Sequence, residues 1–290
     1  WGLRGSGDPA ARTPARVVVE RFTTTTPDAS LQRLTSALSL ALERELRRGG
    51  LQPVSVEAGA DDLVIGGAAD REGDEHVLNV NMRRGSGPAL WSARYARDAS
   101  ALAGFEEEAA TSVSDVVHCA STSASMDRRR VSDAVLGMFL EGCAVRRPTD
   151  LGQAAEYVEV TRRLTTLAPN LSAAHSQHAL ALAIQAHQRF VGGPQATADR
   201  AAVKAAADRA LSLNPRNGEA HFAIGVSYGL GGRWRERELS FDRAEALSPA
   251  LSIVGNYRAG LLREVGRLDE ADALNAQAVA ADRYSIYLTR

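Results

Sequence analysis

The 290-residue sequence has few of the features that mark nucleic-acid-binding or membrane-spanning proteins. It contains two cysteines and 5% aromatic residues, and its formal net charge is −1. A net charge this close to zero gives no overall field toward nucleic acid or acidic lipid. The scarcity of aromatics also argues against a base-stacking surface. Because the sequence has no run of about 18 apolar residues, it contains no candidate membrane span.

Catalytic motifs are missing as well. The sequence has no Walker phosphate loop, no Gly-x-Ser-x-Gly and no His-Glu-x-x-His. The glycines of Ile65-Gly66-Gly67-Ala68 do not open a helix, so they do not predict a nucleotide site. The acidic run Glu106-Glu107-Glu108 suits a helix start and does not form a converging acid/base pair. We therefore predict a protein that is not an enzyme and needs no cofactor or metal.

Residues 16 to 120 combine strand and helix patterns. Val17-Val18-Val19 begins a β-branched run of strand length. Leucines at 31, 34, 38, 42 and 46 then form one apolar helical face, which Gly49-Gly50 ends. Further strands are predicted at 53–56, 62–68, 76–82 and 90–95, followed by a helix at about 99–120. Strands clustered after one crossover helix predict an α+β domain with a small mixed β-sheet.

Two polar segments flank this domain. Residues 1–15 are rich in Gly, Ser, Asp and Pro and predict a flexible linker. Trp1 suits either a truncated end or the last interfacial residue of a removed membrane helix. Residues 121–130 end in three arginines and predict a solvated junction in preference to a phosphate-binding patch.

From residue 131 to 290 the pattern is helical and repetitive. Leu167-Ala168-Pro169, Leu213-Asn214-Pro215 and Leu247-Ser248-Pro249 close successive apolar runs, and the last two prolines stand 34 residues apart. This period is typical of tetratricopeptide helix–turn–helix repeats, which stack into a solenoid. The repeat at 218–249 fits best, although Arg237 stands where alanine is usual. We predict three to four repeats in an all-α solenoid.

The first helix of each such pair lines a concave face, which is the predicted partner-binding groove. The residues that alignment places there are Phe222, Val226, Leu230, Ile253, Asn256, Arg263 and Glu264. Their mixture of apolar and charged side chains suits an extended peptide or a protein domain. The alternative is that the array packs against the α/β domain and leaves no free groove.

The order of motifs in the first half resembles the TolB N-terminal-like domain. The resemblance is carried by Leu63-Val64-Ile65-Gly66-Gly67, by the Gly73-Asp74 turn and by Leu90-Trp91-Ser92-Ala93-Arg94-Tyr95. Two positions depart from that family's pattern, because Arg21 precedes Phe22 where proline is usual and His76 replaces a common arginine.

Such a domain followed by tetratricopeptide-like helices resembles the periplasmic half of CadC/ToxR-type membrane-anchored transcription regulators. The resemblance implies a non-catalytic signal-sensing region on the periplasmic face of the bacterial inner membrane, anchored just before Trp1. It would act through self-association or a protein or peptide partner, without touching DNA itself. Because the same pair of domains occurs on adenylate cyclases, a cytoplasmic peptide-binding scaffold is the alternative.

The state of the two cysteines depends on whether the protein is periplasmic or cytoplasmic. Cys119 falls near the end of the helix that closes the α/β domain, and Cys143 falls in the first solenoid helix. In an oxidising compartment we expect them to form a disulfide across the junction, which stabilises by roughly 3–4 kcal/mol in the chain-entropy model. In a reducing compartment they would be two buried thiols.

Two histidines provide a further hypothesis. His175 and His178 are three residues apart, so they share a helix face and have a spacing compatible with metal ligation. No nearby Cys, Asp or Glu completes a ligand set, and both fall at repeat positions that are normally buried. A structural role is therefore favoured, and pH sensing through their protonation near pH 6 is the weaker alternative.

Overall fold

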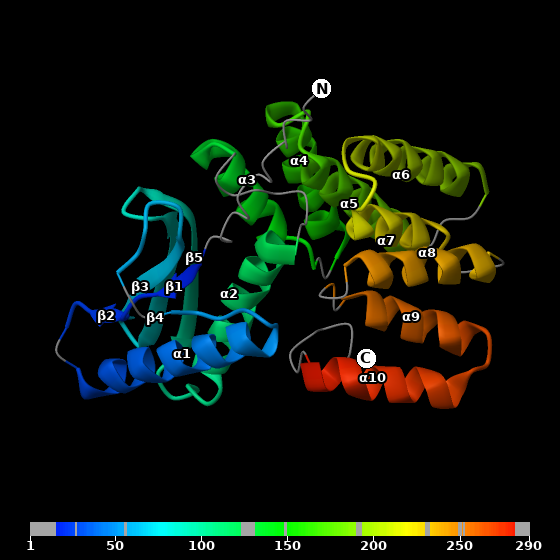
Figure 1. Ribbon diagram of the computed structural model, residues 1–290. Coiled ribbons are helices and arrows are strands. Elements are labelled where there is room, and N and C mark those ends of the chain that lie inside the picture. The colour runs from blue at the N-terminus through cyan, green and yellow to red at the C-terminus, as the bar shows by residue number, and fades with distance from the viewer. Residues whose placement is uncertain are drawn as a thin grey trace, which may run out of the picture.

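The structure is a computed structural model. It describes residues 16–26, 28–54, 57–122, 131–147, 150–189, 193–229, 233–248, 251 and 253–281. A five-stranded mixed sheet with two helices is followed by helices alone, which confirms the predicted α+β class (Figure 1).

The sheet has the strand order β1-β3-β4-β5. Strands β1 (Val17–Val19) and β2 (Thr23–Thr24) both pair in parallel with β3 (Leu63–Glu72). Strands β4 (Glu75–Arg84) and β5 (Ala89–Asp98) continue the sheet in antiparallel fashion. The β3–β4 turn needs a left-handed residue, and Gly73 supplies it with φ 62°.

Two neighbouring helices, α1 (Ala29–Arg48) and α2 (Phe105–Thr122), pack on one face of the sheet. Asp28 begins α1 by accepting hydrogen bonds from the backbone N–H groups of Ser30 and Leu31. The predicted leucine stripe of α1 is buried against alternate residues of β3 and β4. The opposite face carries exposed polar side chains such as Asn79 and Arg94, as expected for an antiparallel sheet with one solvated side.

The structure differs from the prediction at two of the elements expected in this half, and it adds the short strand β2. The strand expected at 53–56 is reduced to a bridge between Val54 and Val18, and residues 55–56 lie outside the described residues. The closing helix begins at Phe105 instead of about 99. The reason is local, because the Asp98 side chain accepts hydrogen bonds from the backbone N–H and hydroxyl of Ser100 and holds a turn there.

The second half consists of helices that pack as consecutive antiparallel pairs (Figure 1). The bounds are α3 (Asp133–Ala144), α4 (Leu151–Leu167), α5 (Ser172–Arg189), α6 (Gly193–Leu213), α7 (Gly218–Ser227), α8 (Trp234–Leu247), α9 (Ile253–Glu264) and α10 (Leu268–Ala281). Helix α5 contacts α4, α6 and α7, and α7 contacts α8, which is the stacking of tetratricopeptide-like repeats. A side chain on Gly225 would come within 2.5 Å of the Phe241 ring, so glycine is required where α7 crosses α8.

The two halves share one hydrophobic core at their junction. The core of the sheet and of α1 and α2 continues into α3, α4 and α5 through Leu136, Phe139, Leu164 and Ala173. A second core fills the later helices. The segment 123–130, within the predicted junction, lies outside the described residues, and the packing on either side of it is continuous.

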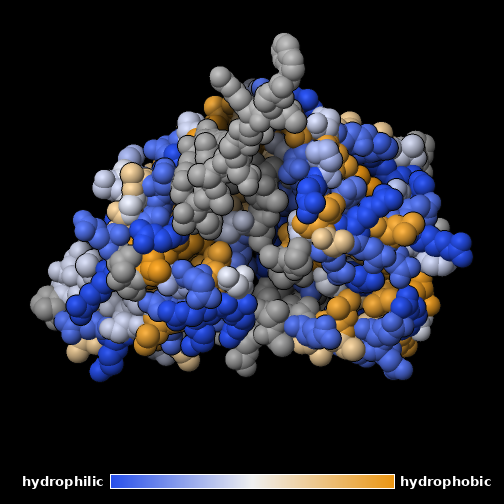
Figure 2. Space-filling model, in the orientation of Figure 1, coloured by the Kyte–Doolittle hydropathy of each residue, from blue (hydrophilic) through white to orange (hydrophobic). Residues whose placement is uncertain are grey.

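Few large hydrophobic side chains remain on the surface of the described part of the chain. In Figure 2 the visible face is largely hydrophilic, with hydrophobic patches over both halves of the molecule. On the last helices Trp234, Leu239 and Leu268 are exposed by 44%, 57% and 58%. They are scattered among charged residues, which is normal for a protein surface.

Candidate functional site

The junction between the halves is held by a disulfide and a glutamine. Cys119 of α2 and Cys143 of α3 are joined with their Cα atoms 5.7 Å apart, and both are buried. The side-chain Nε2 of Gln177, from α5, lies 3.4 Å from the Cys143 sulfur and 3.7 Å from the Cys119 sulfur. Three helices from two halves therefore meet at one covalent link that solvent does not reach.

Close packing around Gln177 explains a glycine in α3. A Cβ on Gly142 would lie 2.5 Å from the Gln177 Oε1 atom, so this position admits no side chain while Gln177 stays in place. The Oε1 atom is itself buried and has no hydrogen-bond partner among the described residues, whereas Nε2 lies within reach of the sulfurs. The buried sulfurs and the close Gly142–Gln177 contact are the geometry of packed helices.

Two charged groups that are poorly exposed to solvent, Arg146 and Glu219, interact electrostatically near the same helices. Arg146, just after α3, is 6% exposed, and burial is the main cause that lowers the pKa of its guanidinium. Glu219, in the first turn of α7, has its carboxyl pKa raised by burial, while a 2.7 Å hydrogen bond from the Ser176 hydroxyl opposes that shift. These groups connect the α3–α4 turn, α5 and α7, so we interpret them as part of the same joint.

The structure corrects the predicted concave groove. Phe222, Val226 and Ile253 are only 0%, 1% and 3% exposed, so they belong to the second core and cannot contact a partner. The Phe222 ring packs against Phe241 at 5.8 Å and edge-on against Tyr257 at 5.2 Å. Helix α7 is apolar on more than one side because helices cover it on several sides, and so its pattern did not identify an open face.

The remaining groove residues differ among themselves. Asn256 is half-buried, and its Oδ1 atom has no hydrogen-bond partner among the described residues. Glu264 accepts a 2.6 Å hydrogen bond from Arg237, whose side chain is only 3% exposed. Arg263 is exposed and lies 3.6 Å from Asp272. Leu230 lies outside the described residues.

Arg237 stands at a position where the tetratricopeptide pattern usually has alanine. Its guanidinium donates to the Gly229 carbonyl as well as to Glu264, and it lies 5.7 Å from the Phe241 ring centroid. The arginine therefore ties α8 to the loop before it and to the end of α9.

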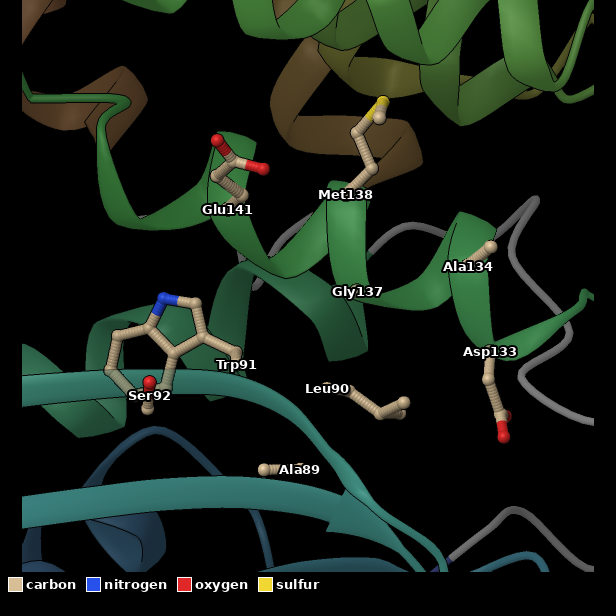
Figure 3. A pocket seen from close by; sticks show the side chains of 9 residues that line it. All are labelled: Ala89, Leu90, Trp91, Ser92, Asp133, Ala134, Gly137, Met138 and Glu141. Carbon is tan, nitrogen blue, oxygen red and sulfur yellow. The ribbon is translucent and has the colours of Figure 1, made fainter.

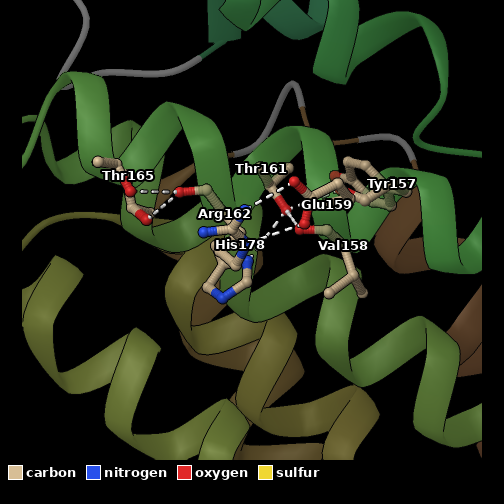
Figure 4. A network of polar contacts seen from close by, with 8 residues as sticks. Tyr157, Val158, Glu159, Thr161, Arg162, Thr165 and His178 are labelled. Carbon is tan, nitrogen blue, oxygen red and sulfur yellow. Dashed lines mark hydrogen bonds and ion pairs between the residues drawn. The ribbon is translucent and has the colours of Figure 1, made fainter.

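The two predicted histidines have separate partners. His178 Nδ1 lies 3.0 Å from the Thr161 hydroxyl, which itself donates to the Tyr157 carbonyl at 2.8 Å (Figure 4). The Thr161 oxygen must then accept a hydrogen bond from a protonated Nδ1, which assigns the tautomer of the neutral ring. His175 Nε2 lies 2.9 Å from the Pro169 carbonyl oxygen.

These contacts correct the pH-sensing hypothesis for His178. Burial, together with the neighbouring His175 and Arg162, lowers its pKa to about 4, so it stays neutral near pH 6. Among the described residues, no group of three or more His, Cys, Asp or Glu side chains could hold a metal ion.

An open cleft lies between β5 and α3, where sequence reasoning placed no site (Figure 3). Its volume is about 580 Å³, and its lining residues are Ala89, Leu90, Trp91, Ser92, Asp133, Ala134, Gly137, Met138 and Glu141. Trp91 points from β5 toward α3 in Figure 3. The one local signal in the sequence is Gly137 within an apolar helix, because a Cβ there would lie 2.9 Å from the Leu90 carbonyl oxygen.

Comparisons with known proteins do not identify a family for this chain. No family model and no curated protein matches the chain. A solved structure of a thermophilic TPR protein from Thermus thermophilus is similar with a TM-score of 0.42 and 20% sequence identity. The match covers 54% of this chain and 85% of that one. The assignment of the repeats therefore depends on the period in the sequence and on the helix packing.

Proposed function

We propose that this chain is a non-catalytic partner-binding region in which the α/β half and the tetratricopeptide-like helices work as one unit. The observation that carries the proposal is the buried Cys119–Cys143 disulfide, which joins the two halves at a shared core. Because α2, α3 and α5 meet at this link, a partner bound to either half would act on both. Stacked helix pairs with extended outer surfaces are well suited to binding proteins or peptides.

We further propose that the region senses a signal in the periplasm for a membrane-anchored winged-helix transcription regulator. Two observations support this finer assignment. The first is the resemblance of the strand and turn motifs to the TolB N-terminal-like domain, followed by helical repeats. The second is the disulfide, since such bonds persist in oxidising compartments such as the bacterial periplasm. Among the described helices, none combines the length and hydropathy that a bilayer crossing requires.

The compartment can be tested on protein taken from its native cells. Cells are quenched in acid, the protein is denatured, and free thiols are alkylated without reduction before mass spectrometry. We expect a peptide pair linked through Cys119 and Cys143 and no alkylated cysteine. The same sample reduced before alkylation is the control and should show both cysteines modified.

Fully alkylated cysteines in the unreduced native sample would overturn the periplasmic assignment and favour a cytoplasmic scaffold. Sequencing the coding region upstream of Trp1 provides an independent check. A winged-helix pattern followed by an apolar span is the expected result, whereas a cyclase domain in that place would favour the scaffold.

A further inference from the structure

The last strand of the sheet has a stretch of backbone with no neighbouring strand. β5 ends the strand order, and among the described residues it pairs only with β4. Helix α3 lies against the Leu90 carbonyl near the start of β5, so the edge is covered there. Further along, residues 93–97 make no backbone hydrogen bond away from β4 within the described part of the chain.

The hydrogen bond at the end of β5 shows which residues face this open edge. The Ala99 N–H donates to the Asp74 carbonyl at 2.9 Å, so the backbone of Ala99 points toward β4. The direction of the N–H and C=O groups alternates from residue to residue along a strand. The backbone groups of Arg94, Ala96 and Asp98 therefore point outward. An unpaired row of this kind is a template for another strand.

The charges along this edge are complementary to themselves. Arg94 and Asp98 are both exposed and lie on the same face of the sheet, with Ala96 midway between them. Two copies of β5 placed antiparallel about Ala96 bring each Arg94 opposite Asp98 of the other copy. In this register the opposed residues are also the ones whose backbone groups point outward, so they can exchange hydrogen bonds.

The neighbouring registers lack this match. A two-fold axis at Tyr95 places Arg94 opposite Ala96, and an axis at Arg94 or at Arg97 places two arginines opposite each other. Like charges directly opposite across two strands are destabilising. The charge pattern therefore selects the axis at Ala96, where the small side chain also lets the two strands approach.

Both charged groups can take a further partner. Asp98 accepts hydrogen bonds from the backbone N–H and hydroxyl of Ser100, and it has no cationic partner among the described residues. Arg94 is paired with Glu72 at 2.8 Å, yet half of its side chain is exposed. A guanidinium has several N–H donors and a carboxylate has several acceptor positions, so each can hold a second group.

We infer that two copies of this chain associate through β5, antiparallel about Ala96, and join their sheets into one continuous sheet. The inference deepens the proposed partner-binding function and rests on it, with a second copy as the partner. Each dimer contains two Arg94–Asp98 pairs and backbone hydrogen bonds along residues 94–98. Helix α3 lies outside the paired segment, because it contacts β5 near Leu90.

The first test measures self-association of the oxidised 290-residue protein by sedimentation equilibrium up to millimolar concentration, and we expect a dimer. Arg94→Asp and Asp98→Arg each place like charges opposite one another, so each should weaken the dimer by about tenfold. An equimolar mixture of the two variants restores opposite charges at both pairs and should associate like the unmodified chain. Arg163→Asp, an equal charge change at an exposed residue of α4, is the matched control and should leave the association unchanged.

A second test fixes the register by cross-linking. In the inferred dimer the two Ala96 Cα atoms lie about 5.5 Å apart, which is within disulfide range. Ala96→Cys should therefore form a covalent dimer under mild oxidation. Ser92→Cys is the control, because the two copies of that residue would lie more than about 25 Å apart and should not be linked.

Several results would overturn the inference. They are a monomer at millimolar concentration, undiminished association of both charge variants, or a mixture of the folded variants that stays monomeric. Cross-linking of Ser92→Cys as fast as that of Ala96→Cys would also overturn it. The cysteine mass measurement does not depend on self-association, so failure here is distinguishable from failure of the proposed function.

Discussion

Two joints in this molecule are built in different ways. The first joins the helical half to the α/β half, and the last joins α9 and α10 to the helix pair before them. At the first joint, α3 and α5 meet the α/β half through a disulfide, the Gln177 side chain and a continuous apolar core. At the last joint, α9 meets the preceding pair through the second core, which includes Ile253 and the Phe222–Tyr257 contact, and a set of arginine ion pairs adds to this packing. These pairs are Arg237–Glu264, Arg258–Glu245 and Arg267–Glu238.

This difference predicts which of the two joints opens first. Covalent and apolar attachments respond little to salt, whereas exposed ion pairs each stabilise by only about 0–1 kcal/mol and are screened. Arg258 and Arg267 are paired on partly exposed side chains, so they hold the last joint weakly. We therefore expect hydrogen exchange in α9 and α10 to be faster than in α2, α3 and α5.

The largest expected effect comes from removing the aromatic centre of the last joint. Phe222→Ala deletes a fully buried ring that contacts both Phe241 and Tyr257, so the free energy of unfolding should fall by about 3–5 kcal/mol. Hydrogen exchange should lose protection in α7 to α10 and keep it in the sheet. Leu239→Ala, on the exposed side of α8, is the control and should cost no more than about 0.5 kcal/mol. Equal loss of protection in the sheet would mean that the two ends do not differ.

The second effect breaks the first joint. Cys119→Ala with Cys143→Ala removes a link between residues 24 apart in sequence, and the free energy of unfolding should fall by about 3–4 kcal/mol. The lost protection should then be found in α2 and α3 and not in α9. Urea unfolding and hydrogen exchange together check both statements. An unchanged free energy of unfolding would show that the shared core alone holds this joint.

These two joints also show how far the sequence predicts the fold. The leucine spacing of α1 and the Gly73-Asp74 turn are local signals, and both were confirmed. Phe222 was assigned to a groove because a repeat pattern gives the position of a residue in its helix pair. The pattern does not say which neighbours cover that residue, so the burial of Phe222 became visible only in three dimensions.

The cleft was missed for the same reason. Trp91 was correctly predicted to lie in a strand, and Met138 in a helix. Their meeting depends on how α3 packs against β5, across the predicted junction at 121–130, and no spacing in the sequence encodes that contact. Gly137 fits the contact, but a glycine alone does not identify its neighbour.

A third prediction concerns the loss of stability at low pH, which should arise in part from protonation of His178 between α4 and α5. Its pKa is about 4 in the fold against 6.5 when free, so the fold favours the neutral ring. The stabilisation is therefore complete above pH 6.5 and is lost as the pH falls toward 4, by roughly 2–3 kcal/mol. Burial lowers the pKa of His118 and His187 as well, so they add in the same direction. Urea unfolding at several pH values should show that the free energy of unfolding falls less steeply with decreasing pH in His178→Asn than in the unmodified chain. His175→Asn is the matched control substitution on the same helix. A slope identical to that of the unmodified chain in His178→Asn would contradict the assignment.

The smallest effect tests whether ion pairing matters at the last joint. Glu264→Gln removes the negative charge opposite Arg237, a side chain only 3% exposed, yet leaves an oxygen that can accept its hydrogen bond. The cost should therefore be about 1–2 kcal/mol, below that of breaking a fully buried pair. Glu270→Gln is the control, because Glu270 pairs with Arg267 on an exposed surface and its loss should cost at most about 0.5 kcal/mol. The cost of Glu264→Gln should also persist in high salt, since screening reaches a buried guanidinium poorly. If both substitutions cost the same and both costs vanish in salt, Arg237 contributes no more than a surface charge. The last joint would then depend on the apolar packing of the second core.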